Sequence, residues 1–209
     1  MSGIAGLRRL RAEKPKEVVQ EQCELCAKPL GPEHPHMVHT VERRIVCACI
    51  PCSMLFDNPG AAAKSMKRIP DRYLADPSFT LSDSQWDDLQ IPVRMAFFFQ
   101  NSIQDKVIAC YPSPAGATES ELPLDNWTSG VGAGRLAAML EPDVEALLVS
   151  RGEHNTGPGE CLLVPIDACY KLVALVRMHW KGFDGGSEAW SAIDSFFADV
   201  RERARELES

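Results

Sequence analysis

The chain has 209 residues, of which 45% are hydrophobic, and a formal net charge of −7. This length allows one sizeable domain, or one domain with a small module, and the apolar content suits a buried core. No apolar run approaches the roughly 18 residues that cross a bilayer, and the first residues lack the apolar segment of a secretory signal. The sequence therefore argues against a membrane span, and we expect a cytoplasmic protein with reduced cysteines.

The charge is unevenly distributed along the chain. Residues 1–72 carry 12 Lys/Arg and 8 Asp/Glu, whereas residues 73–209 carry 10 and 21. Nucleic-acid-binding proteins usually show a concentrated basic field. Only the first third of this chain is basic, and mildly so, which makes nucleic acid a minor hypothesis. In that hypothesis Arg43 and Arg44 would contact phosphate.

The first 80 residues divide into three predicted segments. Residues 1–22 are expected to form an arm or a short helix, because Pro15 interrupts the helical pattern. Residues 23–60 form a Cys-rich module that ends at the turn sequence "DNPG". Residues 61–80 are expected to connect this module to the rest of the chain.

Two Cys-x-x-Cys pairs give the strongest signal in the sequence. Cys23 and Cys26 form the first pair, and Cys49 and Cys52 form the second. A two-residue gap folds back so that both sulfurs point into one hollow, and two such knuckles complete a tetrahedron around zinc. A module of this size cannot bury enough apolar surface to fold alone, so we expect Zn²⁺ to stabilise a zinc-ribbon-like fold.

Several residues near the two pairs are alternative ligands. Cys47 precedes Cys49 by two residues, so on a strand both would face the same side, and either could bind the metal. The segment "HPHMVH" adds His34, His36 and His39, any one of which could replace a cysteine. Four thiolates also suit a single iron ion, but rubredoxin-type knuckles generally place glycine where this chain has Ala27 and Ser53.

Residues 81–209 are predicted to form an α+β domain, a mostly antiparallel sheet packed against C-terminal helices. Ser82 and Gln85 have the spacing of a capping box at the start of a short helix. Alternating and apolar runs predict four strands in two hairpins, 93–100 with 106–111 and 143–151 with 160–165.

The remaining segments of this domain are predicted to be loops and helices. Residues 112–123 are rich in loop formers, and residues 134–140 suit a helical turn or two. Apolar residues at helical spacing predict two closing helices. We expect Asp167 to cap the first and Ser187 to cap the second, whose apolar stripe reaches Leu207.

No set of catalytic residues is assembled by the sequence. Cys110 and Cys161 lie in predicted strands and Cys169 in a predicted helix, where core thiols are expected. A nucleophilic Cys169 would need a base nearby, and His179 lies ten residues away, about 15 Å along a helix. The sequence therefore favours a non-catalytic protein without deciding the question.

Long segments of the chain carry a resemblance to known proteins. They are "CELCAKPLGPEHPHM" and "CACIPCSMLF" in the first part, and "IPVRMAFFFQNS", "YPSPAGATESELPL", "PDVEALLV" and "VPIDACYKLVALVR" in the second. With these segments the chain resembles an uncharacterised bacterial family encoded beside the actinobacterial-type, high-affinity NiFe hydrogenases. The resemblance implies a role in hydrogenase maturation or assembly, with hydrogenase subunits or maturation factors as partners. It implies no catalytic residue.

Three functions from different classes follow from these observations. The one we favour is a non-catalytic, zinc-binding accessory or adaptor protein linked to NiFe hydrogenase maturation or assembly. The second is a zinc-ribbon regulator that binds nucleic acid. The third is a rubredoxin-like electron carrier with iron in place of zinc.

Overall fold

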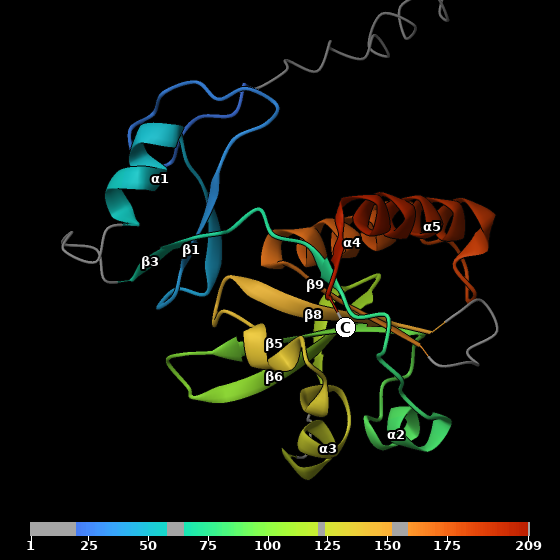
Figure 1. The fold of residues 1–209 in the computed structure, drawn as a ribbon. Coiled ribbons are helices and arrows are strands. Elements are labelled where there is room, and N and C mark those ends of the chain that lie inside the picture. The colour runs from blue at the N-terminus through green and yellow to red at the C-terminus, as the bar shows by residue number, and fades with distance from the viewer. Residues whose placement is uncertain (1–19, 58–64, 121–123, 152–158, 209) are drawn as a thin grey trace, which may run out of the picture.

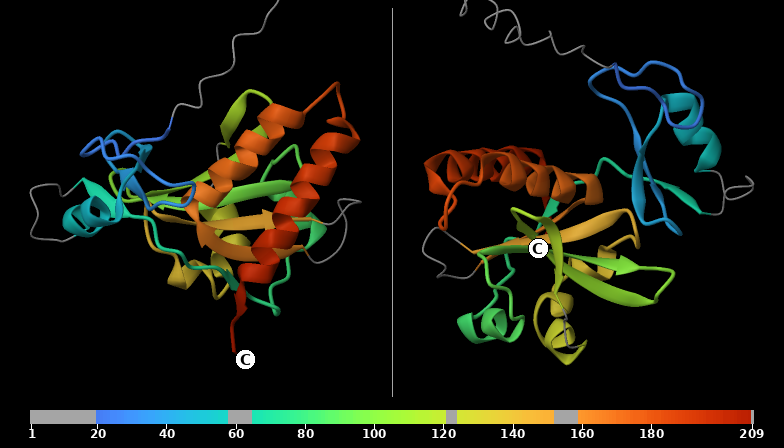
Figure 2. Two further views of the ribbon diagram at one scale, coloured as in Figure 1. Left: turned by 90° about the horizontal axis from the view of Figure 1, so that it is seen from above. Right: turned by 180° about the vertical axis from the view of Figure 1, so that it is seen from behind.

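The computed structural model describes residues 20–57, 65–120, 124–151 and 159–208. These residues form two sheets, a small one near the N-terminus and a large one that carries the longest helices (Figure 1, Figure 2). Most of the predicted arm, residues 1–19, lies outside the described residues. Within the described ranges, no helix combines the length and the apolar character needed to cross a membrane.

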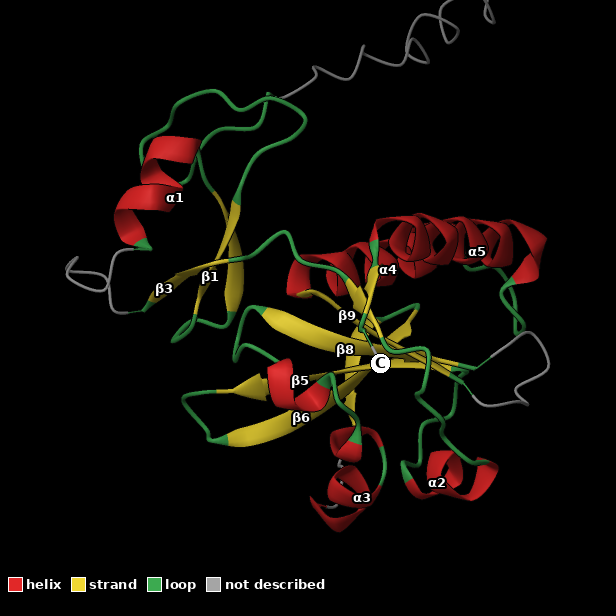
Figure 3. Cartoon of the chain, in the orientation of Figure 1, coloured by secondary structure: helices red, strands yellow, loops and turns green. Residues whose placement is uncertain are grey.

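The small sheet belongs to the N-terminal module, which we define as residues 20–57 and 65–68. Its three antiparallel strands have the order β2-β1-β3, and helix α1 packs against them (Figure 3). The alternation of side chains gives the β1–β2 hairpin two different faces. Met37 and Val46 pack in the core of the module, whereas Val38 packs in the core of the large sheet. The elements of the module are β1 (His36–His39), β2 (Arg44–Cys47), α1 (Ile50–Phe56) and β3 (Met66–Arg68).

The large sheet has seven strands in the order β10-β4-β9-β8-β5-β6-β7. All neighbouring strands are antiparallel except β10 and β4, which are parallel. The predicted α+β class, with a mostly antiparallel sheet and C-terminal helices, is therefore confirmed. The strands are β4 (Leu74–Ala75), β5 (Met95–Asn101), β6 (Lys106–Ser113), β7 (Gly116–Ser120), β8 (Glu145–Ser150), β9 (Glu160–Pro165) and β10 (Arg205–Glu206).

Helices cover both faces of the large sheet (Figure 1). The two long helices lie on one face, with Phe97 and Leu148 beneath them, and shorter helices lie on the other face, over Phe98 and Leu147. Because both faces are covered, the strands are continuously apolar rather than alternating. The long helices are α4 (Ile166–His179) and α5 (Gly186–Arg203), and the shorter ones are α2 (Asp83–Asp88), α3 (Leu124–Ser129) and the 3-10 helices η2 (Val131–Ala133) and η3 (Ala137–Met139).

The local signals in the sequence located several elements correctly. Ser82 and Gln85 form the predicted capping box: the Ser82 hydroxyl accepts from the Gln85 N–H, and the Gln85 side chain accepts from the Ser82 N–H. Both predicted hairpins are present, as β5–β6 and β8–β9. The prediction of a loop over residues 112–123 was wrong, because β6 extends through Ser113 and β7 follows. Pro112 lies near the end of β6, beyond the residues that pair with β5, and the polar residues that suggested a loop lie in β7, the edge strand.

Both predicted helix caps were wrong. Pro165 caps α4, which places Asp167 within its first turn, and Gly185 caps α5. Gly185 has φ +88°, and a Cβ at this position would lie 2.9 Å from the Trp180 ring, so the turn requires glycine. Helix α5 ends at Arg203, and Leu207 lies beyond it against the core on the opposite face of the sheet.

The N-terminal module is joined to the large sheet by apolar and charged contacts. Val38 and Ile69 pack in the core beneath the long helices. The Lys67 ammonium lies 2.7 Å from the Asp143 carboxylate, and His36 Nδ1 lies 2.7 Å from the Asp167 carboxylate. Residues 61–80, expected as a connector, thus contribute one strand to each sheet.

A buried ion pair fixes the chain where it passes between the two sheets. The Glu145 side chain on β8 is fully buried, and the Arg72 guanidinium bonds to both of its carboxylate oxygens. The backbone N–H of Glu141 donates a further hydrogen bond, 2.9 Å long. A buried carboxylate needs such partners, because its desolvation is otherwise uncompensated.

Replacing Arg72 with methionine should leave the Glu145 carboxylate buried without its cation. We expect the free energy of unfolding at pH 7 to fall by about 3 kcal/mol, because removing one partner of a buried ion pair is strongly destabilising. Denaturant unfolding measures the loss. The same replacement at Arg177, which is exposed on α4, should change stability by less than about 0.5 kcal/mol. Equal losses in the two variants would contradict the role of Arg72.

Asp143 should make the stability of the protein depend on pH. Burial alone would raise the pKa of Asp143, but hydrogen bonds from Lys67 and Ser102 outweigh burial and lower it. A carboxylate whose pKa is lowered in the folded state stabilises the fold above its unfolded-state pKa of about 3.9, and the stabilisation is lost as pH falls through the folded-state pKa.

We therefore expect Asp143→Asn to be less stable than the wild type at pH 7, with a difference that shrinks below about pH 4. Asparagine accepts the left-handed backbone at this position, φ +72°. Unfolding of both proteins across this pH range tests the prediction, and the contributions of all shared groups cancel in the difference. A difference that does not change with pH would count against it.

Candidate metal centre

The first cysteine pair lies in a tight loop that precedes β1. The N–H of Cys23 donates to the Lys28 carbonyl at 2.8 Å, and the N–H of Ala27 donates to the Cys23 carbonyl at 2.7 Å. Ala27 adopts the left-handed conformation, φ +61°, that glycine usually supplies. The loop therefore closes as a knuckle although alanine follows Cys26.

The second pair lies at the start of helix α1 and not in a second knuckle. Cys49 is the N-cap residue of α1, and Cys52 lies in its first turn. The expectation of a second knuckle was wrong because Pro51, two residues after Cys49, lies in the first turn of α1, where proline is favoured. The three-residue offset still turns both side chains to the same side, as expected for a ligand pair.

The two pairs bring four sulfurs together in the four-cysteine group (Cys23, Cys26, Cys49 and Cys52). All four sulfurs lie within 4.8 Å of one another, and those of Cys26 and Cys49 are 3.7 Å apart. Sulfurs bound 2.3 Å from a tetrahedral zinc ion would be about 3.8 Å apart. The four are free thiols at the spacing a metal ion needs, so the group can hold one.

Hydrogen bonds favour negative charge at one end of the four-cysteine group. Burial alone would raise the pKa of the Cys23 thiol, but the backbone N–H groups of Cys49 and Leu25 outweigh it and lower the pKa to about 6. Burial and the neighbouring sulfurs raise the pKa of Cys52 to about 12. A cation bound among the four sulfurs would favour the thiolate form of all of them.

The sequence model of one protein family, described as a family of unknown function (DUF5947), matches residues 22–204. The chain belongs to this family. The match covers both the N-terminal module and most of the large sheet with its helices. No curated protein and no solved structure matches the chain.

The alternative ligands lie apart from the four-cysteine group. Cys47 lies directly opposite His36 in the β1–β2 pair, and these two meet His34 in a separate group. Strand β2 ends at Cys47, so the alternation that would place Cys47 and Cys49 on one side stops there. His39 accepts a hydrogen bond from the Glu42 N–H and, among the described residues, is in neither group.

Hydrogen bonds also perturb the residues of this second group. His36 Nδ1–H donates to the Asp167 carboxylate, which raises the pKa of His36, and burial raises the pKa of Cys47. No local pattern predicts the contact between His36 and Asp167, because the two residues are 131 positions apart in the sequence. Aspartate is a common capping residue, so a helix cap was the role that the neighbouring sequence suggested for Asp167.

Arg43 and Arg44 lie in the hairpin turn and at the start of β2, beside carboxylates. Arg44 bonds to Glu24 at 2.6 Å and to Glu42 at 2.7 Å, and the Arg43 guanidinium lies 3.7 Å from Glu119. A phosphate would have to compete with these carboxylates for both arginines. Their use in nucleic-acid binding stays a prediction.

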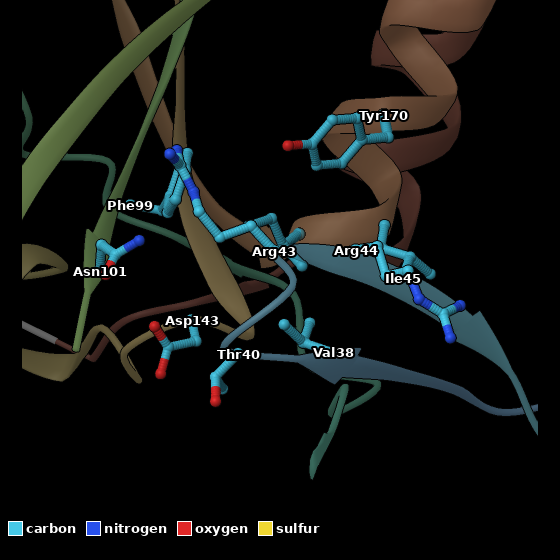
Figure 4. Close-up of a pocket in the computed structure, with 10 residues that line it drawn as sticks. Val38, Thr40, Arg43, Arg44, Ile45, Phe99, Asn101, Asp143 and Tyr170 are labelled. Carbon is cyan, nitrogen blue, oxygen red and sulfur yellow. The ribbon is translucent and has the colours of Figure 1, made fainter. Parts of the chain in front are cut away.

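A pocket of about 410 Å³ lies between the β1–β2 hairpin and the large sheet (Figure 4). Arg43 extends across it toward Phe99, and Arg44 points away (Figure 4). Val38, Phe99 and Tyr170 give it largely apolar walls. A pocket of this size and character suits an apolar side chain or a small ligand better than a phosphate.

The three remaining cysteines lie in the core, as expected. Burial raises the pKa of Cys110 to about 12 and also raises the pKa values of Cys161 and Cys169. The thiolate is the reactive form of cysteine, so these three side chains are inert at neutral pH.

Replacing Cys23 or Cys52 with serine should remove one metal ion per chain and destabilise the N-terminal module, because three sulfurs do not complete the tetrahedron. Elemental analysis of the full chain, with an absorption spectrum, measures the loss and identifies the metal. Zinc is colourless, whereas iron bound to thiolates absorbs visible light.

Cys110→Ala and Cys161→Ala are the matched controls, because they remove thiols that are not in the four-cysteine group. Their metal content should equal that of the wild type. If Cys23→Ser and Cys52→Ser also retained the full complement, the four-cysteine group would not be the metal site.

Proposed function

We propose that this protein is a non-catalytic accessory or adaptor protein whose four-cysteine group holds a structural zinc ion. The observation that carries the proposal is the convergence of four sulfurs from two separate segments within 4.8 Å of one another. Zinc would tie the loop of Cys23 and Cys26 to the start of α1. The core of the module is small, and two of its buried members are Cys23 and Cys49 themselves. Metal ligation is therefore its natural source of stability.

The local geometry favours zinc over iron. Ala27 takes the backbone conformation expected of a knuckle glycine, so its identity alone does not separate the two metals. The second pair separates the two metals, because the residue after Cys52 is Ser53, a fully buried residue of helix α1 whose hydroxyl donates to the Ile50 carbonyl. Only the first pair therefore resembles a rubredoxin knuckle. A Cys-rich structural site that includes a helix start is ordinary zinc chemistry.

An exposed apolar surface on α1 supports the adaptor role. Ile50, Met54 and Leu55 are each more than 60% exposed, although all three are large apolar side chains. Ile50 lies between Cys49 and Cys52, and Met54 and Leu55 follow Cys52 on the same helix, so a metal that fixes the start of α1 would also fix this surface. Clustered exposed apolar side chains are typical of sites where another protein binds.

A protein partner fits these features better than nucleic acid does. The arginines that could contact phosphate already face Glu24, Glu42 and Glu119. The resemblance of the chain to proteins encoded beside NiFe hydrogenases supports a hydrogenase subunit or a maturation factor as the partner. We place the contact on α1.

Replacing Met54 with glutamate should abolish binding to that partner without removing the metal, because the charge would have to be buried at the interface. Tagged full-length chain, produced in its own host, should co-purify with NiFe hydrogenase subunits or maturation factors identified by mass spectrometry. Met54→Glu should reduce their recovery at least about tenfold, the equivalent of 1.4 kcal/mol.

Met178→Glu is the matched control, since Met178 on α4 is 66% exposed and Met54 is 64% exposed. It should leave both metal content and recovery unchanged. Absence of every hydrogenase component from the wild-type preparation would reject the hydrogenase link. Equal recovery with both variants would reject α1 as the contact surface.

A further inference from the structure

A second group of metal-binding residues lies beside the four-cysteine group and shares no residue with it. One ring nitrogen each of His34 and His36 and the sulfur of Cys47 lie within 4.8 Å of one another. His36 and Cys47 are directly opposite in the β1–β2 pair, so their side chains leave the same face of the hairpin. The rings of His34 and His36 meet edge to face, with centroids 4.9 Å apart. We call these three residues the His–His–Cys group.

Hydrogen bonds prepare both imidazoles as ligands. Nδ1 of His34 lies 2.9 Å from the Gly31 carbonyl oxygen, and Nδ1 of His36 lies 2.7 Å from the Asp167 carboxylate. A carbonyl oxygen only accepts, so Nδ1 of His34 carries the proton and its Nε2 carries a lone pair. Histidines that bind metals almost always donate their other N–H to a carbonyl or a carboxylate. Both arrangements occur here, on adjacent rings.

The free nitrogen of His34 is buried without a partner. Its side chain is 7% exposed, and among the described residues Nε2 makes no hydrogen bond. The nearest carboxylate oxygen, from Glu21, lies 3.8 Å away, which is beyond hydrogen-bonding distance. An unpaired polar atom in such a place is costly unless something binds to it. A metal ion would satisfy Nε2 directly.

We propose that His34, His36 and Cys47 form a second site that binds a divalent first-row transition-metal ion of the zinc class. Two imidazoles and one thiolate suit such ions. Glu21 is within reach as a fourth ligand, and its side chain is 65% exposed, so this position is accessible from solvent. Three fixed ligands with one accessible position bind metal more exchangeably than a closed set of four thiolates.

The second site would also couple metal binding to the packing of the module. Asp167 lies in the first turn of α4, whereas all three ligands belong to the N-terminal module. A metal on His36 strengthens the hydrogen bond between its Nδ1–H and Asp167, because coordination makes that proton more acidic. Asp167 is thus a positioning residue that links the site to the large sheet.

A cobalt titration of the full chain tests the proposal. The chain is first loaded with one equivalent of Zn²⁺ to fill the four-cysteine group, under reducing and anaerobic conditions. Co²⁺ added next should bind at one further equivalent per chain and produce a thiolate-to-cobalt charge-transfer band. His34→Ala and Cys47→Ala should each lose this second equivalent together with its charge-transfer band, and both should retain the zinc.

Two further variants separate this site from surface binding. His39→Ala removes a histidine of the same hairpin that is in neither group, and it should bind Co²⁺ as the wild type does. Asp167→Asn should still bind Co²⁺ but about 10- to 100-fold more weakly, as expected when the outer partner of a ligating histidine is changed. Retained zinc in every variant shows that the module remains folded.

Two results would overturn the proposal. One is saturation of the wild type at a single metal ion per chain. The other is a second equivalent whose amount and spectrum are the same in His34→Ala, Cys47→Ala and the wild type. Because the two sites share no ligand, failure of this test would leave the structural zinc proposal intact.

Discussion

The β1–β2 hairpin has to bury both of its faces, and the arrangement of the whole N-terminal module depends on this constraint. Side chains alternate along a strand, so Met37 and Val46 point toward α1 and the four-cysteine group, while Val38 points into the core of the large sheet. A hairpin this short cannot supply either core alone. On one side a metal ion held by the four sulfurs would supply the missing stability. On the other side it is supplied by the apolar surface beneath α4.

Charged contacts determine how the module sits on the large sheet. Lys67 on β3 pairs with the nearly buried Asp143, and Arg72, in the segment that leads from the module to the large sheet, pairs with the fully buried Glu145 at the start of β8. Ion pairs of this kind add little net stability over apolar packing, but leaving either partner alone is costly. They therefore penalise other placements of the module more than they stabilise this one.

Local patterns in the sequence were sufficient for the features that depend on neighbours in the chain. The Cys-x-x-Cys spacing, the Ser82–Gln85 capping box and the two long hairpins each follow from residues a few positions apart. The knuckle even forms with Ala27 at φ +61°, because the backbone hydrogen bonds of the loop outweigh the strain of one side chain. The two-residue spacing of Cys23 and Cys26 therefore predicted the knuckle better than the identity of the residue that follows Cys26.

The features that the sequence did not predict depend on distant contacts. Strand β7 exists because β6 offers it an edge, and its polar sequence carries no strand signal of its own. Asp167 has the residue type of a helix cap, but its partner His36 is 131 positions away. His34 could be named as a possible ligand, but its buried, unpaired nitrogen is a property of the folded chain alone. Long-range pairing cannot be read from local periodicity.

The two groups of ligands would have different roles in the N-terminal module, because their chemistry differs. A zinc ion held by four thiolates would bind tightly and fix the start of α1, and therefore the exposed surface of Ile50, Met54 and Leu55. The His–His–Cys group has an accessible fourth position and bonds to α4 through Asp167. A permanent ion at the first site would maintain the exposed surface of α1. An exchangeable ion at the second site would change how firmly the N-terminal module is held against the large sheet. An adaptor built in this way would present its partner-binding helix in an orientation that responds to the local supply of metal.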